Sequence, residues 1–580
     1  MGYTYLATFG EGLTCESTRL SLRTHATERL GLRLAASTGC FDLLAASSTP
    51  VLSLPDGQIL IGHLFDASGR AATDFSAFAE LADFKQARKH ILDEYWGEYL
   101  LFQPAAAGSS GLTVMRDPSG GVPCLYSDAR CGTGFVTSDI TLAEALGIHR
   151  ESIDWNFISR CLMYPNARTG ATGLGNVEEL LPGRSLELQG ANALTSEEWS
   201  PWMFLAGGNR HTNLEDAAID IRSTVERSVR TWAETDGTVL MELSGGLDSS
   251  IVAMCLRDTS SSVNLCTVST PVAGGDETVY ARQVADALGA SLECHVLRFD
   301  GARHDAPLPP SAVVPCIGPL QCAVDEVMVA AATEYGAASH FCGAGGDTVF
   351  GARSNASPAV DALKEKGLHA GLSAVHDIAT LHQCTVWKAA RLTARKTIRP
   401  ASLQPAPEIT FLRHPHTLPL EPHPWSRFPS GSLCGDRERA IDLAGIQMFR
   451  DDAPRGGNRW VRMPLLSQPV VEACLRVPTW LQVSGGINRA VARRAFRDVL
   501  PVDVHNRRSK GTFVAYSGSV YQRRKTEMQQ FLSHGHLQEK GLLDIPALET
   551  YLASPAPPRD RSFMRIFDLC MIENWVRRHA

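Results

Sequence analysis

The sequence lacks several features that mark specialised classes of protein. It has no run of about 18 apolar residues, no charged-then-apolar leader with a small-residue cleavage site, and no cysteine pair in C-x-x-C spacing. These absences predict a soluble cytoplasmic protein without a membrane span, a disulfide framework or a zinc knuckle. The net charge is -7, from 55 Lys and Arg against 62 Asp and Glu, so a dedicated nucleic-acid binder is not expected.

What remains is an ordinary globular composition over 580 residues, with 44% hydrophobic and 20% charged residues. Up to Ala206, short apolar or alternating runs separated by glycine, proline and aspartate predict a strand-rich region. The expected strands lie at 58–65, 98–102, 112–115 and 185–188. A glycine-containing stretch follows, and a helical pattern begins near Leu214. The sequence therefore predicts two domains, residues 1–206 and residues 207–580.

The second domain shows alternating strand and helix patterns. Strands are predicted at 238–243, 263–269, 292–297 and 338–343, with helices at 249–257, 277–288 and 323–335. Such alternation implies right-handed βαβ units and a parallel sheet. From Leu443 onward the pattern is mostly helical, so the predicted fold class is α/β with a helical C-terminal part.

The most informative segment is Ser244-Gly245-Gly246-Leu247-Asp248-Ser249-Ser250, between a predicted strand and a predicted helix. Paired glycines let the backbone approach a ligand closely, and the N–H groups of the turn and of the helix N-terminus favour an anion. A carboxylate among these donors makes sense chiefly as a metal ligand, because it otherwise repels phosphates. The alternative is a glycine turn with a serine N-cap. No G-x-x-x-x-G-K-[ST] or G-x-G-x-x-G motif occurs, so the ordinary NTPase loop and the dinucleotide fingerprint are both absent.

This segment resembles the pyrophosphate-binding loop of the ATP-pyrophosphatase superfamily, and specifically its asparagine-synthetase-like branch. The resemblance implies that ATP is cleaved between its α- and β-phosphates, that a carboxylate is adenylated, and that the acyl group passes to an amine. A second segment, Gly343-Ala344-Gly345-Gly346-Asp347, resembles the glycine-rich acidic loop of the branch. The resemblance implies that Asp248 and Asp347 bind Mg²⁺ on the pyrophosphate portion of ATP.

A third segment, Arg507-Arg508-Ser509-Lys510-Gly511, resembles the place where the branch keeps its essential lysine. The resemblance implies that Lys510 stabilises charge as the acyl-adenylate forms or is attacked. A pre-placed cation in a dry site contributes about 3–4 kcal/mol to a transition state. The alternative for Lys510 is a solvated surface side chain. The basic run from Arg489 to Lys510 likewise has two interpretations. It is either the solvent-exposed face of a helix or a surface that binds phosphates or an acidic peptide segment.

The N-terminal half departs from glutamine-dependent asparagine synthetases, which carry a cysteine directly after the initiator methionine. Position 2 is Gly2 and the first cysteine is Cys15, so ammonia cannot be released from glutamine by that route. Three segments nevertheless resemble landmarks of the amidotransferase half, at 96–99, 116–120 and 180–183. We therefore expect residues 1–206 to be an amidotransferase-like domain without glutaminase activity.

The segments 464–469, 478–480 and 489–511 resemble the lasso peptide macrocyclases most. That resemblance implies an ATP- and Mg²⁺-dependent ligase that adenylates an Asp or Glu side chain of a core peptide. The peptide's N-terminal amine then attacks, giving an isopeptide macrolactam, AMP and pyrophosphate. The implied partners are the precursor peptide and the leader peptidase and leader-binding protein of the same pathway. The alternatives are β-lactam or ammonia-dependent asparagine synthesis on a small substrate, and an inactive peptide-binding scaffold.

The proposed ligase reaction also suggests roles for residues outside the three segments. Adenine is expected against the strand that ends at Val268 and Ser269, where open α/β sheets place ligands. Asp276 and Glu277 either orient the nucleotide or magnesium, or cap the following helix. Glu326 and Tyr335 are candidates for deprotonating the amine, with plain helix-face roles as the alternative.

The proline-rich segment Pro400–Pro429 carries His414, His416 and His423. These histidines suggest metal ligands, but no acidic or cysteine partner stands at ligand spacing. A mobile surface loop over a site is the favoured interpretation.

Overall fold

The structure is a computed structural model. It describes residues 2–10, 16–39, 41–81, 83–104, 111–165, 167–205, 208–272, 276–399, 405–413, 418–447, 459–508, 511–554 and 560–580. Within these residues no helix is both long and apolar enough to cross a bilayer.

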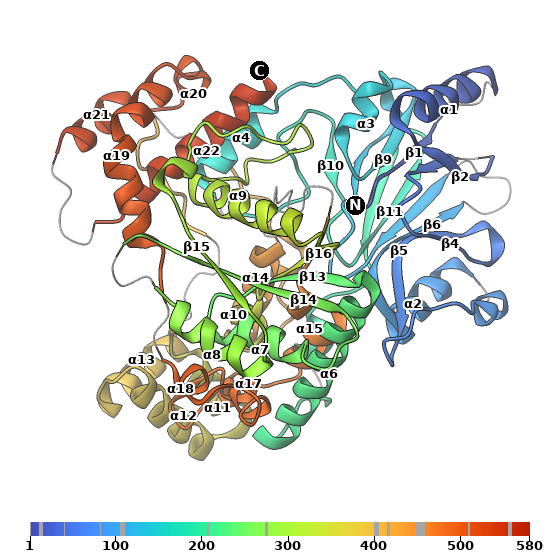
Figure 1. The fold of residues 1–580 in the computed structure, drawn as a ribbon. Coiled ribbons are helices and arrows are strands. Elements are labelled where there is room, and N and C mark those ends of the chain that lie inside the picture. Colours follow the sequence, from blue (N-terminus) through green and yellow to red (C-terminus); the bar gives the residue numbers. More distant parts are fainter. Residues whose placement is uncertain are drawn as a thin grey trace.

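The N-terminal half is built from two six-stranded antiparallel sheets (Figure 1). The first has the order β10 (Glu178–Glu179), β8 (Leu125–Ser127), β9 (Gly134–Thr137), β1 (Tyr5–Phe9), β3 (Phe41–Ala45) and β2 (Arg33–Ser37). The second has the order β12 (Asn192–Glu197), β11 (Arg184–Gln189), β7 (Leu112–Arg116), β6 (Tyr95–Pro104), β5 (Ile59–Asp66) and β4 (Val51–Ser53). The four strands expected at 58–65, 98–102, 112–115 and 185–188 are confirmed as β5, β6, β7 and β11.

These sheets pack face to face because successive side chains of a strand point to opposite faces. In β1, Tyr5 and Ala7 enter the core between the sheets, whereas Leu6 enters a core on the outer face. That outer face is covered by α3 (Ile140–Ala145) and α4 (Trp155–Met163). The outer face of the second sheet is covered by α2 (Phe84–Glu94). The strands of β1 and β3 are buried on both faces, so they read as apolar runs.

The second half contains a five-stranded parallel sheet, as the sequence predicted. Its order is β15 (Leu292–Val296), β14 (Ser262–Ser269), β13 (Thr238–Glu242), β16 (Ser339–Phe341) and β17 (Trp460–Arg462). The helices in the crossovers are α7 (Leu247–Cys255), α8 (Thr278–Leu288) and α9 (Pro319–Glu334), after the long α6 (Leu214–Asp236). Strand β17 was not predicted, because three residues carry too little periodicity to be recognised.

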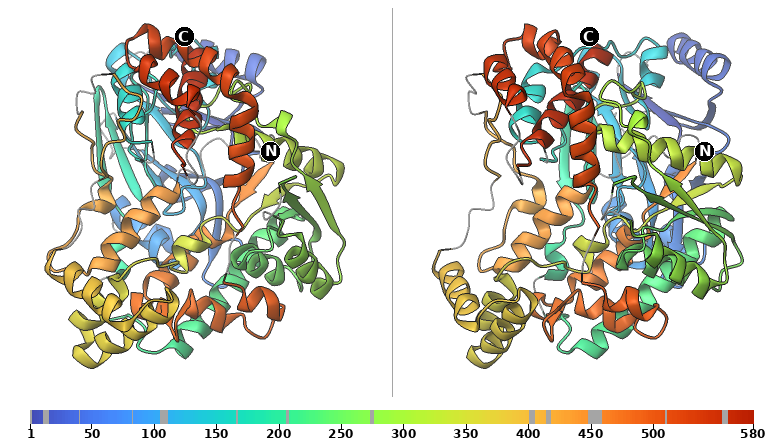
Figure 2. Two further views of the ribbon diagram at one scale, coloured as in Figure 1. Left: turned by 90° about the vertical axis from the view of Figure 1, so that its left-hand side faces the viewer. Right: turned by 60° about the vertical axis from the view of Figure 1, so that its left-hand side comes forward.

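Helices dominate the rest of the chain. After β16 come α10 (Gly346–Val349), α11 (Ser357–Lys366), α12 (Leu368–Leu381), α13 (Val386–Ile398) and α14 (Cys434–Ile446). After β17 come α15 (Gln468–Leu475), α16 (Thr479–Gln482), α17 (Ala490–Ala495), α18 (Val502–Asn506), α19 (Val514–Ser533), α20 (His536–Glu539), α21 (Ile545–Ala553) and α22 (Phe563–His579). Figure 2 shows the last helices, in red, beside the N-terminal half, while α11–α13, in ochre, project from the opposite end.

The boundary expected at residue 206 lies in a connection whose residues 206 and 207 are outside the described part. Before it, α5 (Trp202–Leu205) follows the last strand, and α6 begins at Leu214 as expected. The two halves share a core in which Phe65 and Trp96 of the strand-rich half pack with Trp232 of α6.

Arg462, at the end of β17, joins the two halves through a fully buried ion cluster. Its guanidinium donates two 2.9 Å hydrogen bonds to Asp236 and one of 2.5 Å to Glu98 of the strand-rich half. It also lies 4.0 Å from the ring centroid of Trp232. Removing one partner of a buried ion cluster leaves uncompensated charge in a region that water does not reach.

We therefore expect Arg462→Met to lower the free energy of unfolding by about 3–5 kcal/mol. Equilibrium urea unfolding followed by tryptophan fluorescence measures the change. Arg494→Met is the matched control, because Arg494 pairs with Glu215 on the exposed surface and its loss leaves the midpoint unchanged. An Arg462→Met midpoint equal to that of the control would show that the cluster does not hold the halves together.

Candidate functional site

The site begins at the point where the order of the parallel sheet reverses. The chain runs from β13 outward to β14 and β15, then crosses to β16 on the other side of β13. In open α/β sheets, ligands bind at the carboxyl ends of the strands at such a point. The first glycine loop follows β13 and the second follows β16. The topology therefore places the two loops that were singled out in the sequence at one edge of the sheet.

The first loop turns sharply into α7. Gly245 has φ +73, and a Cβ there would come within 2.8 Å of the carbonyl oxygen of Glu277 and 2.9 Å of the backbone nitrogen of Ala281. Both the backbone conformation and the lack of space therefore require glycine. Gly246 occupies the N-cap position of α7, so Leu247 and Asp248 start the helix two residues earlier than predicted.

Serine hydroxyls brace this loop. The hydroxyl of Ser249 accepts a 3.2 Å hydrogen bond from the backbone N–H of Ser244 and lies 2.9 Å from the hydroxyl of Ser244. The backbone N–H of Gly246 donates to the Ser244 hydroxyl at 3.3 Å. The hydroxyl of Ser250 is buried, and among the described residues nothing pairs with it. Together with the positive end of the α7 dipole, these groups suit an anion such as pyrophosphate.

The second loop packs directly onto the first. A Cβ on Gly343 would lie 2.5 Å from the backbone nitrogen of Ser249, and one on Gly346 would lie 2.4 Å from Cγ of Asp248. Gly345 has φ +87, which again favours glycine. Contact between the loops thus explains Gly343 and Gly346, and composition alone did not reveal that contact.

The aspartates of the two loops, Asp248 and Asp347, both contact the guanidinium group of Arg489. Nη1 of Arg489 lies 3.0 and 3.1 Å from the carboxylate oxygens of Asp248 and 2.7 Å from Oδ1 of Asp347. Two carboxylates that converge on one positive charge fit Mg²⁺, which proteins usually bind through one or two carboxylates and the phosphates of a substrate. Asp248 and Asp347 are therefore the residues that would hold it. No cluster of three or more His, Cys, Asp or Glu occurs among the described residues, so an all-protein metal cage is not formed there.

Arg489 is a site residue that sequence reasoning did not single out. Arg489 belongs to the basic run that was expected to be a solvent-exposed helix face, but its side chain is only 15% exposed. Its backbone adopts φ +54, and the side chain of Asn488 accepts from the backbone N–H groups of Arg353 and Arg489. Left-handed backbone in a non-glycine residue is uncommon and would have been invisible in the sequence.

The segment that carries Lys510 is tied to the first loop, although residues 509 and 510 lie outside the described part. Arg507 donates to the carbonyl oxygen of Gly245 at 3.2 Å, pairs with Glu277, and stacks 4.1 Å from the ring centroid of Tyr280. The backbone N–H of Gly511 also donates to Glu277. The role of Lys510 stays a prediction, and Glu277 is shown to hold this segment.

The remaining nucleotide-side residues have modest contacts. Val268 and Ser269 end β14 beside β13, and Ser269 donates to the carbonyl oxygen of His295 at 3.3 Å. Their contact with adenine stays a prediction. Asp276 accepts from the backbone N–H of Thr278 at 2.9 Å, and hydrogen bonding from the side chain and then the backbone of Thr278 lowers its pKa. Asp276 lies one residue before Glu277, the N-cap residue of α8, and its carboxylate binds the first N–H of that helix.

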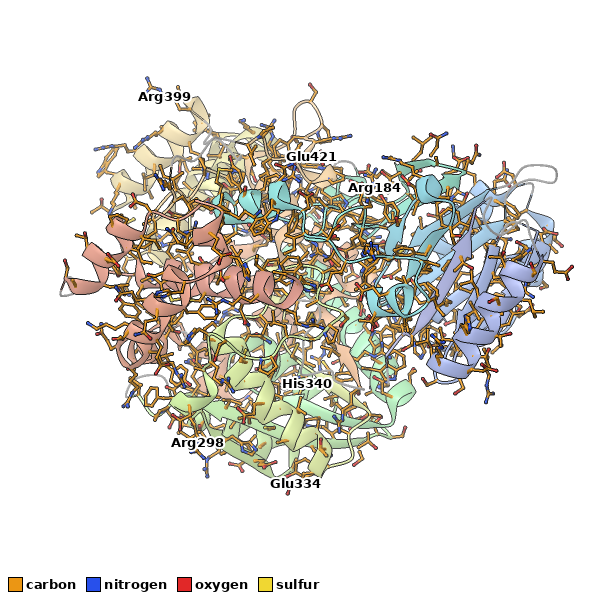
Figure 3. All side chains as sticks on the ribbon, turned by 90° about the horizontal axis from the view of Figure 1, so that it is seen from above. Arg184, Arg298, Glu334, His340, Arg399 and Glu421 are labelled. Atoms are coloured by element: carbon orange, nitrogen blue, oxygen red, sulfur yellow. The ribbon has the colours of Figure 1, made fainter. Side chains whose placement is uncertain are left out.

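The two candidate bases are not brought to the loops. Glu326 is exposed on α9 and lies against Gly301. Tyr335 ends α9 shortly before β16 begins, so it stands at the amino ends of the strands, whereas the loops stand at the carboxyl ends. In Figure 3 its neighbour Glu334 lies at the outer edge of the molecule.

A buried histidine under the loops was also missed. His340 of β16 is fully buried, and its Nε2 lies 3.0 Å from the carboxylate of Glu242 at the end of β13 (Figure 3). An isolated histidine in an apolar strand gives no signal in one sequence. The pair links the two strands that carry the loops.

A cavity of about 1850 Å³ opens beside the second loop, where Thr348 contributes to its wall. Its other walls come from α14, the start of α22, residues 164–165 and 167–168 of the N-terminal half, and the described parts of the proline-rich segment. His414 and His416 lie outside the described residues, while His423 lines the cavity. The expectation of a mobile surface loop is wrong around His423 and Trp425, because both side chains are buried.

Comparison with known proteins identifies the C-terminal part. No curated protein matches the sequence. Two solved structures align with about half of the sequence at low identity. One is the allosteric regulatory enzyme of purine biosynthesis, with 9% identity, TM-score 0.20 and coverage of 51% of this chain and 75% of that chain. The other is the glutamine phosphoribosylpyrophosphate amidotransferase from B. subtilis, with 9% identity, TM-score 0.23 and coverage of 53% and 95%.

The family comparison is decisive, because a family model for asparagine synthase matches residues 220–577, which is more than half of the sequence. The matched range includes both glycine loops, Arg489 and the walls of the cavity that α14 and α22 supply. This chain therefore belongs to the asparagine synthase family.

Proposed function

We propose that the chain is a lasso peptide cyclase. Members of the asparagine synthase family are ATP-dependent ligases that form amide bonds and produce AMP and pyrophosphate. In the proposed reaction an Asp or Glu side chain of a core peptide is adenylated. The peptide's N-terminal amine then attacks the acyl carbon, AMP leaves, and an isopeptide bond closes the ring. One water is lost from the peptide overall.

The observation that carries this proposal is the size of the cavity beside Thr348. Small-molecule pockets measure roughly 300–1,000 Å³, whereas this cavity measures about 1850 Å³. Aspartate or the precursor of a β-lactam would leave most of it unfilled. A folded peptide uses such a volume, because its tail must lie across the ring as the ring closes.

The loops supply the nucleotide end of this arrangement. The turn at Gly245 and Gly246 and the start of α7 offer N–H donors to the departing pyrophosphate. Bound Mg²⁺ would neutralise charge that develops on the phosphates, and Asp248 and Asp347 are the residues that would hold it. Arg489 already lies between these carboxylates and offers further N–H donors to the phosphates.

The N-terminal half acts in this proposal as a structural partner of the ligase half. Tyr3 contributes its hydroxyl to the buried cluster of Arg462 and Glu98 between the halves. The N-terminal half also contributes residues 164–165 and 167–168 to the cavity wall.

Orientation is the main catalytic contribution expected from the cavity. Holding the amine and the acyl carbon in line contributes up to about 7–11 kcal/mol by the effective-molarity argument. The leader peptidase and the leader-binding protein remain proposed partners, since they would deliver the linear peptide to this cavity.

The reaction is tested with the purified protein, ATP, Mg²⁺ and a candidate precursor core peptide. We expect mass spectrometry to show a product lighter by one water and resistant to carboxypeptidase, because a threaded tail is protected by its ring. The same protein given free aspartate and ammonia should produce no AMP.

Two results would contradict the proposal. AMP formation from aspartate and ammonia would favour a small-substrate synthetase. Peptide binding with no ATP consumption under any condition would favour an inactive scaffold.

Substitutions in the loops test the assignment of the nucleotide site. We expect Asp248→Ala and Lys510→Met each to lower turnover by at least about 10²-fold, because each removes a charge that acts on the transition state. Single-turnover measurements with the core peptide give the rates, and circular dichroism checks folding.

Asp276→Ala is the matched control for Asp248→Ala. Asp276 precedes α8 in the same half, but its carboxylate accepts a hydrogen bond from the backbone N–H of Thr278. Its loss should change turnover less than about threefold while lowering stability by about 1 kcal/mol, the net contribution of one hydrogen bond. Equal losses from both aspartate substitutions would mean that Asp248 acts only through local structure.

A further inference from the structure

The wall of the large cavity contains two buried hydrogen-bond donors that have no role in the nucleotide site. They are His423, from the proline-rich segment, and Arg565, near the start of α22. Both line the cavity, and their residues are only 8% and 5% exposed. Neither the glycine loops nor the buried cluster of Arg462 uses them.

His423 presents a neutral N–H. Its Nδ1 accepts a 3.2 Å hydrogen bond from the backbone N–H of Trp425, so the ring proton resides on Nε2. Burial first, and then the positive charges of Arg168 and Arg184, lower the pKa of His423 to about 3, which keeps the ring neutral. Among the described residues, nothing accepts a hydrogen bond from Nε2.

Arg565 donates hydrogen bonds to three segments, and one of its guanidinium nitrogens, Nη1, has no partner among the described residues. Its Nε donates to the carbonyl oxygen of Thr410 at 3.5 Å, and its Nη2 donates to the carbonyl oxygens of Leu162 and of Glu408. The described part of the chain offers no acceptor to Nη1. Arg565 therefore fixes the proline-rich segment and α4 to α22, and one of its N–H groups is unused.

Both donors adjoin the turn that follows α4. Arg565 binds Leu162 in the last turn of α4, and Arg168, a few residues on, acts on the charge state of His423. Figure 3 labels Glu421 of the proline-rich segment and Arg184 of β11 on the side of the molecule where these parts meet. An unpaired buried N–H is costly, and native proteins rarely keep one without a function.

We propose that His423 and Arg565 form a peptide-anchoring subsite, in which each donates a hydrogen bond to an oxygen acceptor of the peptide. The acceptors are main-chain carbonyl oxygens or a terminal carboxylate. This inference rests on the proposed function only in taking the ligand to be a peptide. Asp568, one turn after Arg565, lines the same cavity and offers an acceptor for a peptide N–H.

The test measures binding without nucleotide, so it does not depend on cyclisation. The immobilised full-length protein is incubated with a synthetic pool of short peptides of randomised sequence, made once as free acids and once as C-terminal amides. Mass spectrometry measures the retained fraction. Equal retention of both pools identifies main-chain carbonyls as the acceptors, whereas retention of the acids alone identifies the terminal carboxylate.

Two substitutions remove the donors, and Arg565→Lys also removes the hydrogen bonds of Arg565 to Thr410, Leu162 and Glu408. His423→Asn keeps an acceptor for the backbone N–H of Trp425 and removes Nε2, and Arg565→Lys keeps the charge and removes the planar N–H fork. We expect each to lower retention by about tenfold. His423→Asn stands alone if Arg565→Lys does not fold.

Arg494→Lys is the control, because Arg494 is exposed on α17 and is not among the described residues that line the cavity, and we expect it to retain peptide as the wild type does. Retention by the folded His423 variant equal to that of the wild type would overturn the inference, and so would no retention by the wild type. Loss of cyclisation alone, with retention still dependent on His423, would overturn the proposed function and leave this subsite standing.

Discussion

The site depends on one steric constraint, which is the contact between two loops that leaves no space for a side chain. Gly343 lies against the backbone of Ser249, and Gly346 lies against the carboxylate of Asp248. The contact is possible because β13 and β16 are neighbours at the point where the sheet reverses its order. It brings Asp248 and Asp347, almost one hundred residues apart, within reach of one guanidinium nitrogen. The phosphate cradle and the candidate metal site follow from that approach.

Much of this arrangement could be predicted from local sequence. The strand before the first loop is a largely apolar run after a glycine, and the first loop combines glycine, serine and aspartate in an order that suits an anion. Other parts could not be predicted, because they depend on long-range contacts. Strand β17 has only three residues, and Arg489 reaches the aspartates through a left-handed backbone. Tyr335 illustrates a consequence of order along the chain, because a residue between the end of a helix and the start of a parallel strand lies at the amino ends of the strands, away from the loops.

The N-terminal half and the proline-rich segment both form part of the cavity wall. Both supply walls beside Thr348, and Arg565 binds carbonyl oxygens from each. The buried cluster of Arg462, Asp236 and Glu98 holds the strand-rich half against the sheet that carries the loops. The strand-rich half thus has a structural role, because it completes the space in which a large substrate would lie.

The central claim is that the loop at Ser244–Ser250 binds the pyrophosphate that leaves when a carboxylate is adenylated. The most direct measurement is identification of the nucleotide products by phosphorus NMR during turnover with the core peptide. The account predicts AMP and pyrophosphate in equal amounts, one of each for every ring closed. Formation of ADP and orthophosphate, or ring closure without nucleotide consumption, would contradict it.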